Sequence, residues 1–249
     1  MRTSNPALGK ATFQTNWFAV TEERMTLEGT ANKSAFFLLV VAAAAFASWI
    51  YLAGLPAFPA IGGVITGLGF CGLAVAYITI RNKEKAAYWG TLYAALEGVA
   101  IGVISFIYEL NYPGIVFQAV LLTFGTLLAL LVIYRLGIIQ VTENLKLGVF
   151  AATGGIALLY LAGFFLRIIG FNIGFLHDAS IGGILFNLLV VAIAAFNLVL
   201  DFDFIEKGVE VGAPKYMEWY AAFGLTVTLI WLYIEILRLL GRSRRRSRR

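Results

Sequence analysis

Three acidic side chains, Glu97, Asp201 and Asp203, lie in or at the ends of long apolar stretches of this 249-residue chain. A carboxylate at the centre of a bilayer costs about 2.5–3.5 kcal/mol on insertion scales, so such a group usually faces a cavity, a partner or an ion path. Carboxylate oxygens are also ligands that hard cations such as Ca²⁺ prefer. The placement of these acids therefore predicts a protein that conducts or senses ions.

A polar stripe follows one side of the apolar stretch 182–202. At 100° per residue, Asn187, Asn197 and Asp201 fall within about 80° of arc on a helix. Asp203 lies about 160° round from Asn187, so the two aspartates should not share a face. We expect one to look into the bundle and the other toward a loop or the headgroups; solvated charge at a helix end is the alternative for both. The amides would coordinate a cation or hydrogen-bond neighbouring helices.

Glu97 is the deepest carboxylate, near the middle of residues 86–108. We expect Glu97 either to line an ion path or, as a neutral acid, to hydrogen-bond a neighbouring helix. In the last apolar stretch, Glu235 and Arg238 have the i, i+3 spacing of a helical ion pair. That spacing favours a structural role for Glu235.

The composition is that of a membrane protein, because 60% of the residues are hydrophobic and only 13% are charged. Ordinary soluble domains have about 25% charged residues. A hydrocarbon core about 30 Å thick needs about 20 residues per spanning helix. The fold class predicted is therefore an all-α integral membrane protein, a seven-transmembrane-helix bundle. The predicted spans are residues 34–54, 60–80, 86–108, 114–134, 147–169, 182–202 and 216–240.

Three regions follow from these spans: a polar N-terminal segment 1–33, a transmembrane domain 34–241 and an arginine-rich tail 242–249. Basic residues in the loops after spans two, four and six place those loops and the N-terminus in the cytoplasm. The tail would then end on the opposite side, so a last segment that fails to cross fully is the alternative. We expect the tail to bind anionic lipids rather than nucleic acid. The basic loop residues are Arg81, Lys83, Lys85, Arg135, Lys146, Lys207 and Lys215.

Glycines in the second and fifth spans are predicted to allow close helix packing, since small residues let transmembrane helices approach. They are Gly62, Gly63, Gly67, Gly69, Gly72, Gly154 and Gly155.

The chain shows no sign of an enzyme. It has one histidine and one cysteine, and neither a GxSxG nucleophile motif nor an HExxH motif occurs. We therefore expect no enzymatic activity and no cofactor, with Ca²⁺ as a permeant or bound ion. The bilayer is the expected environment, and a monomer is favoured over an obligate oligomer.

Several segments resemble the Bax inhibitor-1 family, also called the TMBIM family, and the likeness covers nearly the whole chain. The stretch FNLVLDFDFIEKG resembles the end of the family's sixth helix. The segments similar to the last two helices are 196–208, 215–224 and 231–240. The segments similar to the bacterial branch that includes YccA-like proteins are 4–8, 93–98, 112–114 and 175–178.

The resemblance implies a bundle with the last helix central, in the bacterial inner membrane, that acts as a pH-sensitive calcium leak channel. In the family, an aspartate at the end of helix six pairs with one on the last helix, and protonation of the pair gates the pore. Asp203 best matches the first aspartate. The second falls on Thr228, which cannot supply a carboxylate; Glu218 or Asp201 is the candidate substitute and Arg81 the candidate cationic lock.

On this reading, Ca²⁺ leaks past Glu97 and the amides of Asn187 and Asn197, with Asp201 and Asp203 as its contacts. The rival hypothesis is a non-conducting membrane partner. Resemblance to YccA-like proteins suggests that such a partner would modulate a membrane-bound quality-control protease. The sequence leaves both hypotheses open.

Overall fold

The structure is a computed structural model that describes residues 24–55, 61–171 and 180–247. Seven long helices account for most of these residues, and the described part of the chain contains no strand. All seven are long and apolar enough to cross a membrane. They are α2 (Leu27–Ala53), α3 (Ile61–Arg81), α4 (Ala86–Asn111), α5 (Ile115–Arg135), α6 (Glu143–Ile168), α8 (Ile181–Glu210) and α9 (Met217–Ser247), with a 3₁₀ turn η2 (Lys83–Lys85) before α4. The predicted seven-helix fold class is confirmed.

Three helices extend by seven residues or more beyond the predicted spans: α2, α9 and α8, which continues to Glu210. α2 begins at Leu27, where the Thr26 side chain caps it by accepting a hydrogen bond from Gly29 N at 3.0 Å. α9 continues through Ser247, so Arg242, Arg244, Arg245 and Arg246 prolong the helix. Hydropathy marks only the apolar part of a helix, whereas capping and packing decide where it begins and ends.

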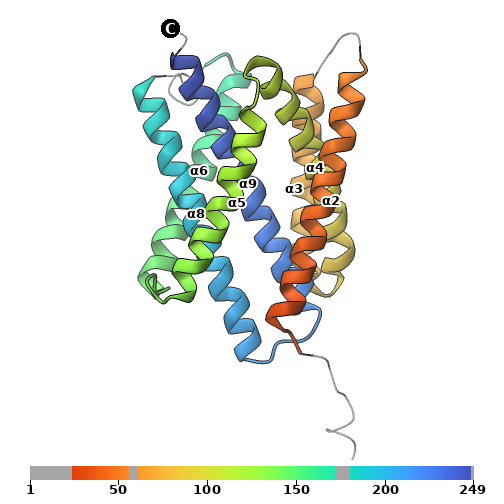
Figure 1. Ribbon diagram of the computed structural model, residues 1–249, viewed down its shortest axis with the longest axis vertical. Coiled ribbons are helices and arrows are strands. Elements are labelled where there is room, and N and C mark those ends of the chain that lie inside the picture. Colours follow the sequence, from red (N-terminus) through yellow and green to blue (C-terminus); the bar gives the residue numbers. More distant parts are fainter. Residues whose placement is uncertain (1–23, 56–60, 172–179, 248–249) are drawn as a thin grey trace, which may run out of the picture.

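α9 is the central helix, as the family resemblance implies. It packs against α2, α4, α5 and α8, whereas α3 packs mainly on α4 and α6 on α8. Figure 1 shows α9 crossing the middle of the bundle, with α2, α3 and α4 on one side and α5, α6 and α8 on the other. Leu232 and Leu237 of α9 are fully buried in the core, together with Phe37 and Leu198. A change in α9 therefore alters its contacts with four other helices, α2, α4, α5 and α8.

The bundle has two ends, which we name by the termini of α9. At the N-terminal face, where α2 and α9 begin, Met25 N donates a hydrogen bond to Ala213 O at 2.7 Å. At the C-terminal face, Arg244 Nη1 donates to Pro113 O at 2.8 Å in the turn between α4 and α5. α9 thus runs from one end of the bundle to the other (Figure 1), which favours a complete last crossing over the incomplete alternative. The loops after α3, α5 and α8 lie at the N-terminal face.

Close helix packing occurs at glycines other than the predicted ones. A Cβ at Gly98 of α4 would lie 2.6 Å from Val41 O of α2, and one at Gly102 would collide with Ala45 and Ser48. Of the predicted glycines, only Gly72 has described atoms within 4 Å of an added Cβ. The prediction is wrong for the remaining six, because their positions on α3 and α6 leave open space where a Cβ would project. These are Gly62, Gly63, Gly67, Gly69, Gly154 and Gly155.

Candidate functional site

Asp201 of α8 faces Thr228 of the central helix. The Thr228 hydroxyl is within hydrogen-bonding reach of the Asp201 carboxyl group, and it also lies 3.3 Å from Gly224 O, one turn earlier in α9. Asp201 Oδ2 is buried and has no hydrogen-bond partner among the described residues. A buried polar atom without a partner is costly and marks a place for a proton, a water or an ion. We call Asp201 and Thr228 the Asp201 centre.

A second polar group lies nearer the C-terminal face. Glu235 is 1% exposed, and its carboxylate accepts hydrogen bonds from Arg238 Nη1 at 2.7 Å, Asn187 Nδ2 at 2.9 Å and Tyr160 OH at 3.2 Å. We call these four residues the Glu235 centre. Because a guanidinium balances the carboxylate, this centre holds α6, α8 and α9 together. The structural role predicted from the i, i+3 spacing is confirmed.

Asn197 faces a different helix from the other members of the predicted stripe. Its Nδ2 donates to Thr153 Oγ1 of α6 and to Ile193 O, both at 2.9 Å. Asn187 and Asp201 face α9, so the stripe divides between two interfaces. Asn197 joins α6 to α8 and does not contribute to the Asp201 centre.

Asp203 lies toward the N-terminal face, as expected for the aspartate that does not look into the bundle. Lys207 Nζ lies 2.7 Å from its Oδ2 and Lys146 Nζ lies 3.5 Å away. The structure therefore brings Asp201, and not Asp203, to Thr228, whereas the match of Asp203 to the family's first aspartate stays a prediction. The i, i+4 spacing was a signal for Lys207, whereas Lys146 comes from α6 and its partnership needed the fold.

Glu218 is fully buried at the start of α9 and bound to the beginning of α2. It accepts hydrogen bonds from Thr26 N at 2.8 Å and Thr26 Oγ1 at 2.9 Å. It also forms ion pairs with Lys33 and, at 3.3 Å, with Lys215. Glu218 precedes Thr228 by ten residues, about 15 Å along the helix. Glu218 therefore joins the start of α2 to the start of α9. It lies too far from Thr228 to take the place of the family's second aspartate.

Arg81 and Glu97 also lie away from the Asp201 centre. Arg81 is exposed at the end of α3, where its Nε donates to Tyr77 OH of the same helix at 3.1 Å. The described basic partners of Asp203 are therefore Lys146 and Lys207, and not Arg81. Glu97 is half-buried and turned toward α3, where Gly72 leaves room for its carboxylate. This position favours helix packing, the alternative expected for Glu97.

No three His, Cys, Asp or Glu side chains come together as metal ligands in the part of the chain that the structure describes. Asp201 and Asp203 point to different surroundings, so they do not form a joint Ca²⁺ site. Among the described carboxylates, Asp201 is the one with a buried oxygen that lacks a partner, and it lies at the central helix. The Asp201 centre is therefore the candidate site.

The architecture and the polar centres can now be set beside known proteins. Comparison with curated proteins and with solved structures found no match. A family model described as Bax inhibitor 1 like matches residues 5–245, nearly the whole chain. The seven apolar helices make the protein a multi-pass membrane protein, and the chain belongs to the Bax inhibitor 1 like family.

Proposed function

We propose that the protein is a pH-sensitive leak channel for Ca²⁺ or similar cations, with Asp201 as its titrating group. The observation that carries this proposal is the buried, unpartnered Oδ2 of Asp201 opposite Thr228, between α8 and the central helix. Such a group inside a membrane bundle usually belongs to an ion or proton path. The family resemblance supports the same activity.

The Asp201 centre has two hydrogen-bonding arrangements that differ by one proton. An ionised Asp201 accepts the hydrogen of the Thr228 hydroxyl. A protonated Asp201 donates to Thr228 Oγ1, and Thr228 then donates its own hydrogen to Gly224 O, the bond to the preceding turn that threonine often makes in helices. A change in pH shifts the populations of these two states. Only the ionised state attracts a cation, so flux should rise as pH rises.

The ion pairs of Asp203 with Lys146 and Lys207 would restrain α8 beside the Asp201 centre. The pair with Lys146 ties α8 to α6 at the N-terminal face, and the pair with Lys207 lies within α8. Release of Asp203 would free this end of α8 to move against α9. We place the N-terminal face in the cytoplasm of a bacterial cell, with the bundle in the inner membrane, because the basic loops gather there.

The test is Ca²⁺ uptake into liposomes that contain the purified protein, measured from pH 6 to pH 8. Asp201→Asn is expected to abolish the pH response, since an amide cannot titrate. Glu84→Gln removes an exposed carboxylate of η2 that is not a described partner of Lys146 or Lys207, and it should leave the response unchanged. Glu97→Gln should also leave it unchanged, because Glu97 lies at the contact of α3 and α4.

A pH response in Asp201→Asn equal to that of the wild type would refute the assignment of Asp201. If no variant gives flux above empty liposomes at any pH, the channel hypothesis fails. The rival hypothesis, a non-conducting partner of a membrane protease, would then be favoured.

A further inference from the structure

A pocket of about 290 Å³ lies between α4 and α9 at the C-terminal face. It is far from the Asp201 centre and plays no part in the proposed conduction. Its described lining includes Arg238, Arg242 and Arg245 of α9, and no carboxylate belongs to that described lining. Arg238 is balanced by Glu235, one turn earlier in α9, and the three guanidinium groups together give one wall of this small hollow a basic character.

The arginines converge because of their spacing. Residues 238, 242 and 245 are separated by four and three positions, so they fall within about 60° of arc on one side of the helix. A helix C-terminus favours basic residues through the backbone dipole. The dipole explains a preference for cations in the last turns, but it does not explain why they share a pocket wall with tyrosines.

Two of the three guanidinium groups are held in place by the protein. Arg238 Nη1 donates to Glu235 Oε1 at 2.7 Å and to Tyr160 OH at 2.9 Å. Arg242 is 8% exposed, and its Nη1 donates to Gly183 O at 2.7 Å. A guanidinium has five N–H donors, so the bonds made by Arg238 Nη1 orient that group and leave its Nη2 side toward other acceptors, while the bond to Gly183 O fixes the position of Arg242. Arg245 is exposed beside them.

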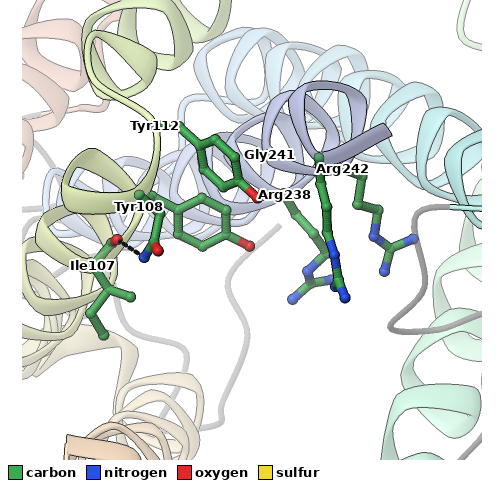
Figure 2. Close-up of a pocket in the computed structure, with 8 residues that line it drawn as sticks. Ile107, Tyr108, Tyr112, Arg238, Gly241 and Arg242 are labelled. Carbon is green, nitrogen blue, oxygen red and sulfur yellow. Dashed lines mark hydrogen bonds between the residues drawn. The ribbon is translucent and has the colours of Figure 1, made fainter. Parts of the chain in front are cut away.

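The opposite wall comes from the last turn of α4. Tyr108 and Tyr112 point their hydroxyl ends toward the arginines in Figure 2. The rings come this near because α9 has a glycine at the contact: a Cβ on Gly241 would lie 2.5 Å from Tyr108 Cε1. Arg244 fixes the rim by donating to Pro113 O at 2.8 Å and to Gln118 Oε1 at 2.9 Å. The hollow is thus built by both helices.

We propose that this pocket binds a phosphate group. Planar guanidinium forks match phosphate oxygens with paired, charge-assisted hydrogen bonds, and the phenol hydroxyls add neutral donors. A phosphate occurs both in anionic phospholipid headgroups and as a free anion. Tyrosines near the end of a membrane helix mark the level of the headgroups, so the site is placed to take a phosphodiester headgroup. The sequence predicts lipid binding by the tail 242–249; the pocket adds Arg238 and the tyrosines of α4 to that prediction.

The test measures binding to the full-length protein in a neutral detergent. The probes are inorganic phosphate, dioctanoyl phosphatidylglycerol and, as a zwitterionic control, dioctanoyl phosphatidylcholine. Arg245→Gln removes an exposed lining charge with little risk to folding and is expected to weaken binding about tenfold, the size of one charge-assisted hydrogen bond. Arg246→Gln removes the same charge from the neighbouring residue, outside the described lining, and should change binding less than about twofold.

Tighter binding of phosphatidylglycerol than of phosphate, with phosphate competing, would identify a headgroup site. Saturable binding of phosphate without binding of the lipid would identify a free-anion site. Equal losses in the two arginine variants, or no saturable binding of either probe, would overturn the proposal. Asp201→Asn should bind phosphate as the wild type does. The phosphate site can therefore be confirmed or refuted whether or not the channel hypothesis holds.

Discussion

At the scale of single residues, the acids of this bundle differ most in the partners that surround them. Glu235 and Glu218 are both fully buried, yet each meets a basic group and several hydrogen-bond donors. Asp201 has a buried oxygen without a described partner. An acid paired with a basic group stabilises the structure. A buried carboxylate without a partner costs free energy, and binding a proton or a cation lowers that cost. This difference separates the structural acids from the candidate functional one.

The Glu235 centre should therefore govern stability. In Glu235→Ala, Arg238 and Asn187 lose their shared acceptor, and we expect a loss of about 3 kcal/mol in the free energy of unfolding. In Glu143→Ala, the exposed pair with Lys146 is lost and the change should stay within about 0.5 kcal/mol. Titration with sodium dodecyl sulfate from mixed micelles would measure both. Equal stabilities of the two variants would contradict a structural role for Glu235.

At the scale of elements, the contact between α2 and α4 is the closest described approach of two helices through glycines. Gly98 and Gly102 form a GxxxG pattern on α4, and Gly90 on the same helix faces Phe37 of α2. In lipid, no hydrophobic effect drives helices together, so packing of this kind supplies the association. The contact fixes α4, and α4 in turn supports the central helix.

Gly98→Ala tests this packing. The added Cβ would lie 2.6 Å from Val41 O and 2.8 Å from Ala44 Cβ, so the helices must separate, and we expect a loss of about 1–3 kcal/mol in the free energy of unfolding. Gly67→Ala on α3 is the matched control, because nothing described lies within 4 Å of its Cβ. Its stability should be unchanged or higher by less than about 1 kcal/mol, since alanine favours the helix. A loss as large in Gly67→Ala as in Gly98→Ala would refute the argument.

At the scale of the whole molecule, the helix count followed from hydropathy because lipid forces every span to be long and apolar. Hydropathy did not show which side of each helix faces its neighbours. Lipid and core are both apolar, so the sequence pattern separates lipid-facing from buried positions only weakly, and the glycines of α3 were misread for this reason. The same limit applies to the site: Asp201 and Asp203 could be placed on different faces, but only the fold shows that Asp201 meets Thr228.

The fold also makes a prediction about the two ends of α9. The basic loops lie at the N-terminal face, but the described arginines of the tail lie at the other face, where two of them are bound to the protein: Arg242 to Gly183 O and Arg244 to Pro113 O. Bound arginines at the end of a complete crossing need not reverse the orientation set by the short loops.

In a Cys71→Ala background, we expect a membrane-impermeant maleimide to label Ser247→Cys in intact cells. Asn82→Cys, beside η2 at the N-terminal face, should be labelled only after the cells are permeabilised. Labelling of both cysteines from the same side would contradict the complete crossing of α9, whereas exchanged sides would keep the fold and reverse only the orientation that the loops predict.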